Sequence, residues 1–243
     1  MNFFSLIKRN FLYKFKKKIL IDADEIHEKS LDKLFQIYGS DKTGIQGHGY
    51  SSFYTSHLED FKNKKINILE IGSYAGASAA AFVKYFSNSN VFCLDVNISN
   101  FKYSSKKIHV YGIDINNEIK VVKTLKKIVQ MHQINNFDLI IDDGSHNLSD
   151  ILSSLNLFFK YLKEGGTYII EDFKHPNYYQ YNRNINHILV DEFLHNIENM
   201  IFTNSSIYTK SDQSYLMNKI NNIDVYKGNL DNSDICFIKK KID

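Results

Sequence analysis

Between residues 66 and 171, short apolar runs alternate with segments whose apolar side chains recur at helical spacing. The apolar runs predict strands at residues 66–71, 91–95, 108–111, 137–141 and 167–170. The segments between them predict helices at residues 77–86, 119–134 and 148–162, with apolar positions three or four residues apart. Strands that alternate with helices predict a parallel sheet covered on both faces, which is an α/β fold.

Further elements are predicted on both sides of this series. Residues 2–20 and 25–37 have the spacing of amphipathic helices, and residues 185–200 predict another helix. Near the end of the chain, the runs 223–226 and 235–238 flank a polar turn that contains Gly228, as the strands of a terminal hairpin would.

The predicted helix of residues 2–20 is basic as well as amphipathic. Lys8, Arg9 and four further lysines precede the first acid, Asp22. A helix of this kind indicates peripheral contact with an anionic membrane or a partner. The alternative is a helix that packs on its own domain or on a second subunit.

The rest of the chain excludes several classes of protein. Subtracting these six positive residues from the total of 30 leaves 24 Lys and Arg against 27 Asp and Glu, so a distributed nucleic-acid surface is not expected. Cys93 and Cys236 lie in apolar runs without paired spacing, which predicts buried thiols in a cytoplasmic protein. No apolar run is long enough to span a membrane.

Acidic residues gather at the ends of two predicted strands. The run from Phe137 ends in Asp142-Asp143-Gly144-Ser145-His146, and the run from Thr167 ends in Glu171-Asp172. Because ligands bind at the carboxyl ends of the strands of an open α/β sheet, these groups predict a hard-cation site with a base beside it. The alternatives are that Asp142 and Asp143 cap the next helix, and that His146 is a surface turn residue.

The turn after the first strand differs from a dinucleotide-binding turn. Glu70 stands two residues before Gly72, and the second glycine of the turn is Gly76, with Tyr74 at the position where a pyrophosphate would approach. This pattern suits a cofactor with an amino acid and a ribose but no pyrophosphate. Asp95, at the end of the second strand, is placed to bind ribose hydroxyls.

Residues 69–78, Leu-Glu-Ile-Gly-Ser-Tyr-Ala-Gly-Ala-Ser, resemble the first motif of class I S-adenosylmethionine-dependent methyltransferases. Together with residues 142–146 and 171–172, they resemble the metal-dependent sugar O-methyltransferases typified by the mycinamicin and macrocin enzymes. Residues 38–42, 48–50 and 53–54 resemble that family's substrate region. The resemblance implies a Rossmann-like seven-stranded methyltransferase fold over residues 38–243, with an N-terminal helical extension at residues 1–37.

The resemblance also implies roles for individual residues. It places Mg²⁺ or Mn²⁺ on Asp143, Glu171 and Asp172, and makes His146 the base. A regular strand would direct Glu171 and Asp172 to opposite faces, so the strand is expected to end at about Ile170. The residues expected to bind S-adenosylmethionine lie in the first motif and at the ends of later strands. They are Glu70, Gly72, Ser73, Gly76, Ser78, Asp95, Asp114 and Asp142. Ile113 stands where the family commonly has an acid, which leaves the role of Asp114 in the adenine pocket open.

The expected acceptor is a hydroxyl group on a sugar, in a glycan or a glycosylated metabolite, and polysaccharide biosynthesis and a homo-oligomer are expected with it. Two alternatives remain. One is a metal-dependent catechol or phenol O-methyltransferase, which uses the same chemistry. The other is a non-catalytic binding subunit on the same fold, although a binding role does not require a base beside acids.

Overall fold

The computed structural model describes residues 3–24, 26, 29–183 and 186–242. The chain forms two compact units, residues 1–135 and residues 136–243. The domain boundary predicted near residue 37 is not this division, and it stays a prediction.

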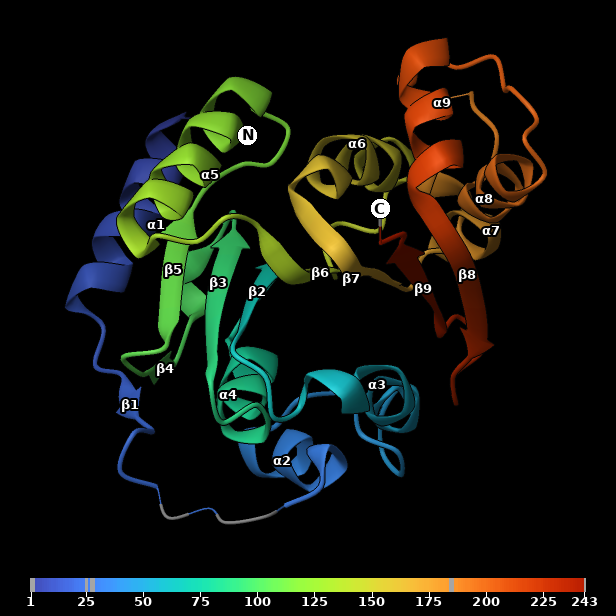
Figure 1. Ribbon diagram of the computed structural model, residues 1–243. Coiled ribbons are helices and arrows are strands. Elements are labelled where there is room, and N and C mark those ends of the chain that lie inside the picture. The colour runs from blue at the N-terminus through green and yellow to red at the C-terminus, as the bar shows by residue number, and fades with distance from the viewer. Residues whose placement is uncertain (1–2, 25, 27–28, 184–185, 243) are drawn as a thin grey trace. The chain divides into compact units, whose positions relative to one another are not determined.

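The first unit is built on three parallel strands. They are β2 (Ile66–Ile71), β3 (Ser89–Asp95) and β5 (Ile108–Gly112), in the order β5-β3-β2. Figure 1 shows α2 (Leu31–Tyr38) and α4 (Ala77–Tyr85) on one face of these strands and α5 (Glu118–His132) on the other. Every residue of β2 is buried, which is expected of a parallel strand covered on both faces. The helix α3 (Ser51–Leu58) and the short 3₁₀ helices η1 (Glu59–Phe61) and η2 (Ile98–Asn100) complete the unit.

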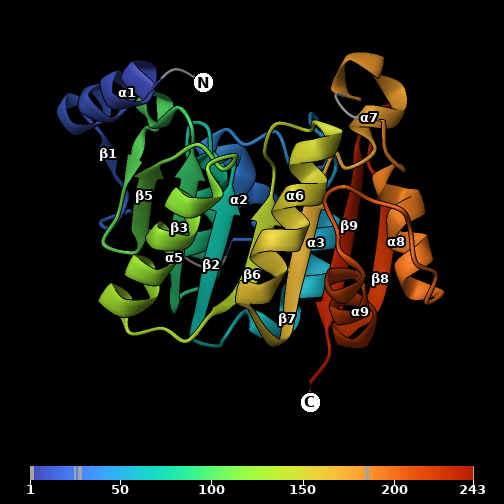
Figure 2. The same cartoon turned by 90° about the horizontal axis from the view of Figure 1, so that it is seen from above.

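The second unit contributes four strands in the order β6-β7-β9-β8. The strands β6 (Phe137–Asp142) and β7 (Leu162–Glu171) are parallel, whereas β9 (Asp234–Lys240) runs antiparallel to both β7 and β8 (Ile220–Lys227). The helices α6 (Leu148–Phe158) and α9 (Lys210–Lys219) lie on one face of these strands (Figure 2). Three strands in one unit and four in the other confirm the predicted seven-stranded α/β fold and its terminal hairpin.

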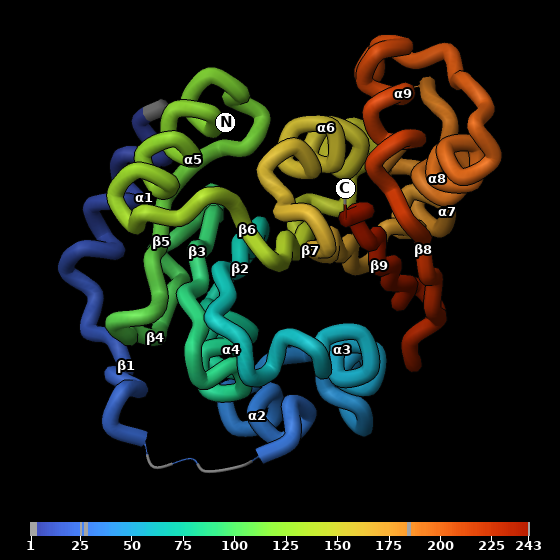
Figure 3. The backbone as a smooth tube through the Cα atoms, in the orientation of Figure 1, coloured from blue at the N-terminus to red at the C-terminus, as the bar shows by residue number. Residues whose placement is uncertain are grey.

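The N-terminal helix is shorter than predicted. Helix α1 covers Phe3–Phe15, and Ile19–Leu20 forms the strand β1, which pairs in parallel with β4 (Tyr103–Ser104). Figure 3 shows the backbone leaving α1 and running to β1 beside β4. The prediction of one helix over residues 2–20 is therefore wrong beyond Phe15. The backbone N–H of Ile19 donates to the carbonyl of Lys102 at 2.8 Å, so the backbone of this segment is bonded to another strand instead.

The second helix begins later than predicted. Its N-cap is Ser30, whose hydroxyl accepts a hydrogen bond from the N–H of Lys33, and α2 begins at Leu31. Ile26, Lys29 and Ser30 are not helical, and residues 25, 27 and 28 lie outside the described residues. The predicted start at residue 25 is therefore wrong, whereas the predicted end is confirmed by Gly39, which forms a left-handed C-cap.

The C-terminal half also contains elements that the sequence pattern misplaced or missed. The helix predicted at residues 185–200 is α8 (Val190–Glu198), and residue 185 is outside the described residues. Helix α6 ends at Phe158 and is followed by the 3₁₀ helix η3 (Phe159–Tyr161) instead of continuing to Leu162. Helix α9 was not predicted, although Thr209 and Asp212 form a capping box at its start.

A histidine pair in the first unit makes stability depend on pH. The imidazole of His109 stacks on Phe92 with ring centroids 4.9 Å apart, and its centroid is 4.2 Å from that of His132. Its Nε2 atom is buried, with no hydrogen-bond partner among the described residues. Burial, and then the neighbouring His132, lowers the pKa of His109 from 6.5 to about 4.

Replacing His109 with phenylalanine is expected to protect the fold against mild acid. Between pH 6.5 and about 4 the unfolded chain binds a proton at His109 that the folded protein does not, so the free energy of unfolding falls as the pH falls. The imidazole is only partly buried, so solvent screening reduces the expected loss at pH 5 to about 1 kcal/mol. Urea unfolding at pH 7.5 and pH 5 should show the variant gaining on the wild type at the lower pH. Exposed His195→Phe is the control, and an equal gap between His109→Phe and wild type at both pH values would contradict the assignment.

Candidate active site

The glycine turn between β2 and α4 has the backbone conformation that its glycines allow. Gly72 has φ 83° and Gly76 has φ 77°, and Tyr74, between them, is also left-handed at φ 41°. Gly76 is the N-cap residue of α4, so the turn presents the first backbone N–H groups of a helix. This is the arrangement that can receive the charged end of a cofactor.

Gly76→Ala is expected to destabilise the protein far more than Gly39→Ala. Both glycines have positive φ, at 77° and 75°. An added Cβ at Gly76 would lie 2.4 Å from the ring of Phe101, whereas one at Gly39 would meet nothing within 4 Å. The second change therefore costs only the backbone strain of about 1 kcal/mol, and the first adds a clash of about 1–3 kcal/mol. Urea unfolding of the two variants measures the difference, and equal losses would show that Phe101 moves aside freely.

Glu70 lies at the buried end of the same turn. Its side chain is fully buried, its Oε1 accepts a short hydrogen bond from the hydroxyl of Ser78, and the thiol of Cys93 lies 3.9 Å from its Oε2. Ser73 is buried beside it, with its hydroxyl 3.4 Å from the carbonyl of Glu70. The structure thus brings Glu70, Ser73 and Ser78 together around the turn, and their contact with a cofactor stays a prediction.

Asp95 fixes the neighbouring backbone. One of its carboxylate oxygens accepts the N–H of Tyr74 at 2.7 Å, and the other accepts the N–H of Asn97. Each oxygen retains a second lone pair, so these bonds leave Asp95 able to accept a ribose hydroxyl. Further along, Ile113 is buried, whereas half-buried Asp114 accepts the N–H of Asn116 at 3.2 Å. The expected cofactor contacts of Asp95 and Asp114 stay predictions.

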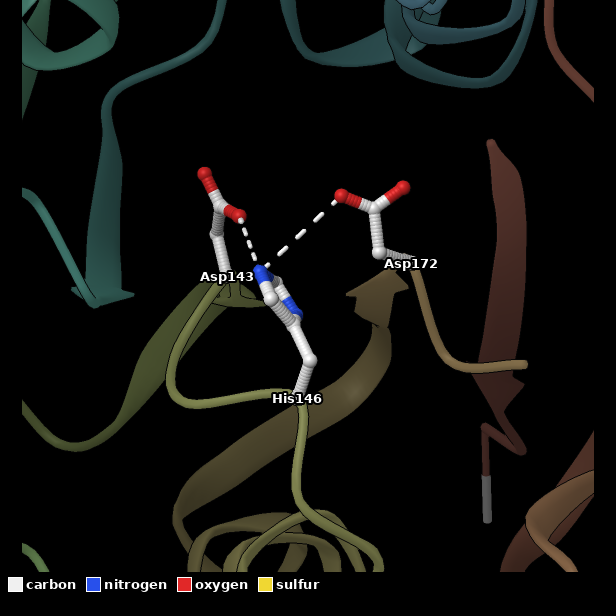
Figure 4. A group of neighbouring side chains, drawn as sticks. All are labelled: Asp143, His146 and Asp172. Carbon is white, nitrogen blue, oxygen red and sulfur yellow. Dashed lines mark ion pairs between the residues drawn. The ribbon is translucent and has the colours of Figure 1, made fainter. Parts of the chain in front are cut away.

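A second set of predicted residues converges in the second unit. Asp143, His146 and Asp172 each offer an atom within 4.8 Å of the others (Figure 4). His146 Nε2 lies 3.8 Å from Asp143 Oδ1 and 3.9 Å from Asp172 Oδ2. The side chains of Asp143 and His146 are each 24% exposed, so water or a ligand can reach them. We call this set the Asp-His-Asp group.

The backbone explains how residues from two neighbouring strand ends meet. Strand β7 continues through Glu171, where it still pairs with Ile235 of β9, one residue beyond the predicted end at about Ile170. Asp172 then has φ 49°, and His146 has φ 55°. Left-handed backbone is uncommon outside glycine, and such residues concentrate at functional sites.

Glu171 is placed differently from Asp172. Its side chain is 2% exposed, and it is not a member of the Asp-His-Asp group, which was identified among the described residues. The structure therefore brings together two of the three predicted metal ligands with the predicted base. The role of Glu171 as a ligand stays a prediction.

Asp142 is held inside the second unit. It is 4% exposed, and the phenol of Tyr168 lies 3.4 Å from its Oδ2. Burial raises the pKa of Asp142 from 3.8 to about 6, against the opposing effects of Ser154, His146 and the N–H of Gly144. Asp142 and Asp143 are thus in different surroundings, and the predicted cofactor contact of Asp142 stays a prediction.

An aromatic cluster beside the Asp-His-Asp group was not assigned from the sequence. The ring centroid of His175 is 5.6 Å from that of His146 and 4.4 Å from that of Tyr179, and Tyr179 is 5.5 Å from Tyr181. Tyr179 and Tyr181 are 37% and 74% exposed. His175 lies on α7 (His175–Tyr178) and Tyr181 on η4 (Gln180–Asn182), with Tyr179 between these two short helices, which follow β7. The tyrosine-rich segment after an acidic strand end was the signal that could have identified the cluster.

The polar loop of residues 40–50 is anchored to α2. Asp32 Oδ1 accepts the N–H of Gly44 at 2.6 Å and the hydroxyl of Ser51 at 2.8 Å. A hollow of about 470 Å³ is lined by Gln36, Gly39, Ser40, Asp41, Thr43, Ile45 and Gln46. These hydrogen bonds fix the position of the loop relative to α2. The role in substrate binding that its resemblance implies stays a prediction.

Residues 69–173 match a family model described as a methyltransferase domain. The matched segment begins within β2 and ends just after Asp172, so it contains both the glycine turn and the Asp-His-Asp group. Residues 69–173 are therefore similar to a methyltransferase domain, and the chain has the Rossmann-like methyltransferase fold that the resemblance of its motifs implied.

Several curated relatives are named as O-methyltransferases. The L-olivosyl-oleandolide 3-O-methyltransferase of Streptomyces antibioticus is 30% identical over 161 residues, which are 63% of this chain and 40% of that protein. The mycinamicin VI 2''-O-methyltransferase of Micromonospora griseorubida is 27% identical over 149 residues, 58% of this chain and 35% of that protein. The chain thus spans well under half the length of these relatives.

A solved structure gives the same fold. The MycE methyltransferase from the mycinamycin biosynthetic pathway, in complex with Mg, S-adenosylhomocysteine (SAH) and mycinamycin VI, superposes with a TM-score of 0.68. The match covers 88% of this chain and 55% of that chain at 21% identity. At this identity the likeness establishes the fold, and the chemistry has to be argued from the residues of this chain.

Proposed function

We propose that the protein is an S-adenosylmethionine-dependent O-methyltransferase that acts on a sugar hydroxyl of a glycan or glycosylated metabolite, with a divalent cation. The observation that carries this proposal is the convergence of Asp143, His146 and Asp172 within the matched methyltransferase segment. Relatives whose names include a sugar, such as the L-olivosyl-oleandolide 3-O-methyltransferase, support the acceptor class.

The donor set fits a hard cation. Mg²⁺ and Mn²⁺ prefer oxygen ligands, and ligands at about 2.1 Å from an ion stand about 3–4 Å from one another. Asp143 and Asp172 offer carboxylate oxygens within 4.8 Å of each other, near enough to approach one ion. Asp143 and Asp172 would hold the cation, with Glu171 as a further proposed ligand. A bound cation would supply positive charge that favours the deprotonated form of an acceptor hydroxyl.

Other residues of this chain would bind the cofactor and accept the proton. S-adenosylmethionine, held by Glu70, Gly72 and Asp95, would supply an electrophilic methyl group. His146 would accept the proton of the acceptor hydroxyl at Nε2, which would leave the alkoxide oxygen able to take the methyl group that S-adenosylmethionine supplies. The products are the methyl ether and SAH, and the proton remains on His146 until it is released to water.

The aromatic cluster supports an acceptor with a ring. Exposed aromatic rings provide large contact areas at low conformational cost, and Tyr179 and Tyr181 lie within this cluster beside His146. The apolar face of a sugar ring would pack there. A catechol or phenol would also fit this chemistry, and it is the alternative acceptor; a panel containing both kinds of acceptor separates them.

We propose further that residues 1–37 are an N-terminal extension to a methyltransferase domain of residues 38–243. We also propose that the protein is a cytoplasmic homo-oligomer that acts in polysaccharide biosynthesis. Both cysteines are buried and free, which supports a reducing compartment. Among the described residues, no helix is long and apolar enough to cross a membrane.

S-adenosylmethionine is expected to bind in calorimetry, and Asp95→Ala is expected to weaken binding by about tenfold or more, because the variant loses a charged hydrogen-bond acceptor. Loss of the bonds to Tyr74 and Asn97 could also loosen the turn, so Asp95→Asn is measured beside it. Asp231→Ala, an exposed acid in the turn between β8 and β9, is the control. Tight binding of NAD with none of S-adenosylmethionine would refute the proposed cofactor.

A further inference from the structure

Helix α1 presents its apolar residues to solvent. Phe4, Ile7, Phe11, Leu12 and Phe15 are 75%, 50%, 60%, 48% and 74% exposed. Phe4, Ile7, Phe11 and Phe15 recur at intervals of three or four residues and form one stripe along the helix, and the rings of Phe11 and Phe15 are 4.7 Å apart. We call these four residues the α1 stripe.

The opposite, more polar face of α1 attaches the helix to the first unit. Asn10 Nδ2 lies 3.4 Å from the carbonyl of Gly112, and Arg9 donates to the carbonyl of Val96 at 3.2 Å. Beyond the helix end, Lys16 Nζ donates to the carbonyls of Ser99 and Asn100 at 2.8 and 3.0 Å. The approach is close, because an added Cβ at Gly112 would lie 2.4 Å from the Asn10 side chain.

This orientation is the reverse of the usual one. An amphipathic surface helix normally turns its apolar stripe toward the core and its polar face toward water. Here carbonyl groups of the first unit hold the polar face, and the side chains of the α1 stripe are exposed to solvent. The fold of the first unit therefore does not account for the apolar residues of the stripe.

Basic residues frame the α1 stripe. At about 100° per residue, Lys8 and Lys14 lie about 60° to either side of Phe11 on the helix. Both are exposed, as is Lys17 just beyond the helix, and no acid precedes Asp22. Lysines on both sides of an apolar stripe can keep their ammonium groups at the level of lipid headgroups while the apolar side chains enter the layer below.

We propose that α1 is a membrane-docking helix that lies in the surface of an anionic lipid bilayer, with the α1 stripe inserted and Lys8, Lys14 and Lys17 against the headgroups. The charge favours this occupant over a second copy of the chain. Two α1 helices packed through their stripes would bring their lysines together without an acid on either helix, and like charges repel.

Vesicle co-sedimentation of the full chain tests the docking. Vesicles of phosphatidylcholine with 30% phosphatidylglycerol, as the probe, should bind the protein, and pure phosphatidylcholine should bind it much more weakly. Lys14→Gln/Lys17→Gln should lower the partition coefficient by about twenty-five-fold, since each basic residue near an anionic surface contributes about a factor of five. Phe11→Ser/Phe15→Ser should lower it by about a hundredfold.

Matched variants separate docking from net charge and from folding. Lys126→Gln/Lys127→Gln removes two exposed lysines from α5 and should retain binding. Because the four replaced residues of α1 and its extension are solvent-exposed, all three variants should keep the wild-type melting temperature. Equal binding to neutral vesicles, or equal losses in the α5 and α1 lysine variants, would overturn the proposal. So would a stable dimer that Phe11→Ser/Phe15→Ser dissociates, with no vesicle binding by either protein.

Discussion

Asp143→Ala is expected to abolish methyl transfer and the response of the protein to Mg²⁺ or Mn²⁺. Asp143 and Asp172 supply the two carboxylates of the Asp-His-Asp group, so the variant leaves a single carboxylate in that group for a doubly charged ion. The expected loss in turnover is about a thousandfold, since both the charge that favours the deprotonated hydroxyl and the positioning of the acceptor are removed. Binding of Mn²⁺, followed by electron paramagnetic resonance, should weaken in parallel.

Binding of S-adenosylmethionine distinguishes this loss from misfolding. Asp143 is in the second unit, whereas the glycine turn is in the first, so calorimetry should find cofactor affinity close to that of wild type. Asp231→Ala removes an exposed acid elsewhere in the second unit and should leave turnover and Mn²⁺ binding unchanged. Full turnover of Asp143→Ala in the presence of a chelator would exclude the proposed cation site.

His146→Ala is expected to lower turnover by about a hundredfold or more, which is the usual contribution of a positioned base. His146 Nε2 lies between the two carboxylates, at 3.8 and 3.9 Å, so the same ring could act as a base or as a cation ligand. Mn²⁺ affinity separates the two roles. A base leaves the affinity of His146→Ala near that of wild type, whereas a ligand lowers it about as much as Asp143→Ala does.

Two further measurements complete the test of His146. Added imidazole should restore part of the turnover of His146→Ala if the missing function is proton acceptance. His195→Ala, which changes an exposed histidine of α8, should behave as wild type. Unchanged turnover in His146→Ala would show that the hydroxyl loses its proton elsewhere and that His146 is a turn residue.

The strands could be predicted from the sequence because burial on both faces requires runs of mostly apolar residues. Residues 66–71 and 137–141 were found in this way, and β2 and β6 confirm them. The ends of α1 and α2 could not be predicted from spacing alone. The segment after Phe15 pairs with β4, a contact with residues 103–104 that helical periodicity does not contain.

The sequence predicted which residues belong to the candidate site, but not how the backbone places them. Motif spacing identified Asp143, His146 and Asp172 as neighbours, and the structure brings them together. Glu171 and Asp172 follow one another in sequence, and only the left-handed φ of Asp172 shows how the chain turns after β7. The inward orientation of the polar face of α1 could not be predicted from the sequence either. Amphipathic spacing identifies the apolar stripe, but it does not show that carbonyl groups of the first unit bind the opposite face.

The measurement that tests the central claim most directly is release of SAH from S-adenosylmethionine by the purified protein. The assay uses a panel of glycosylated acceptors and catechols, with Mg²⁺ or with excess chelator. The account predicts release with a sugar-bearing acceptor that depends on Mg²⁺, with the methyl group found on a sugar oxygen by mass spectrometry. Methyl transfer to catechols alone, or equal release in excess chelator, would contradict it.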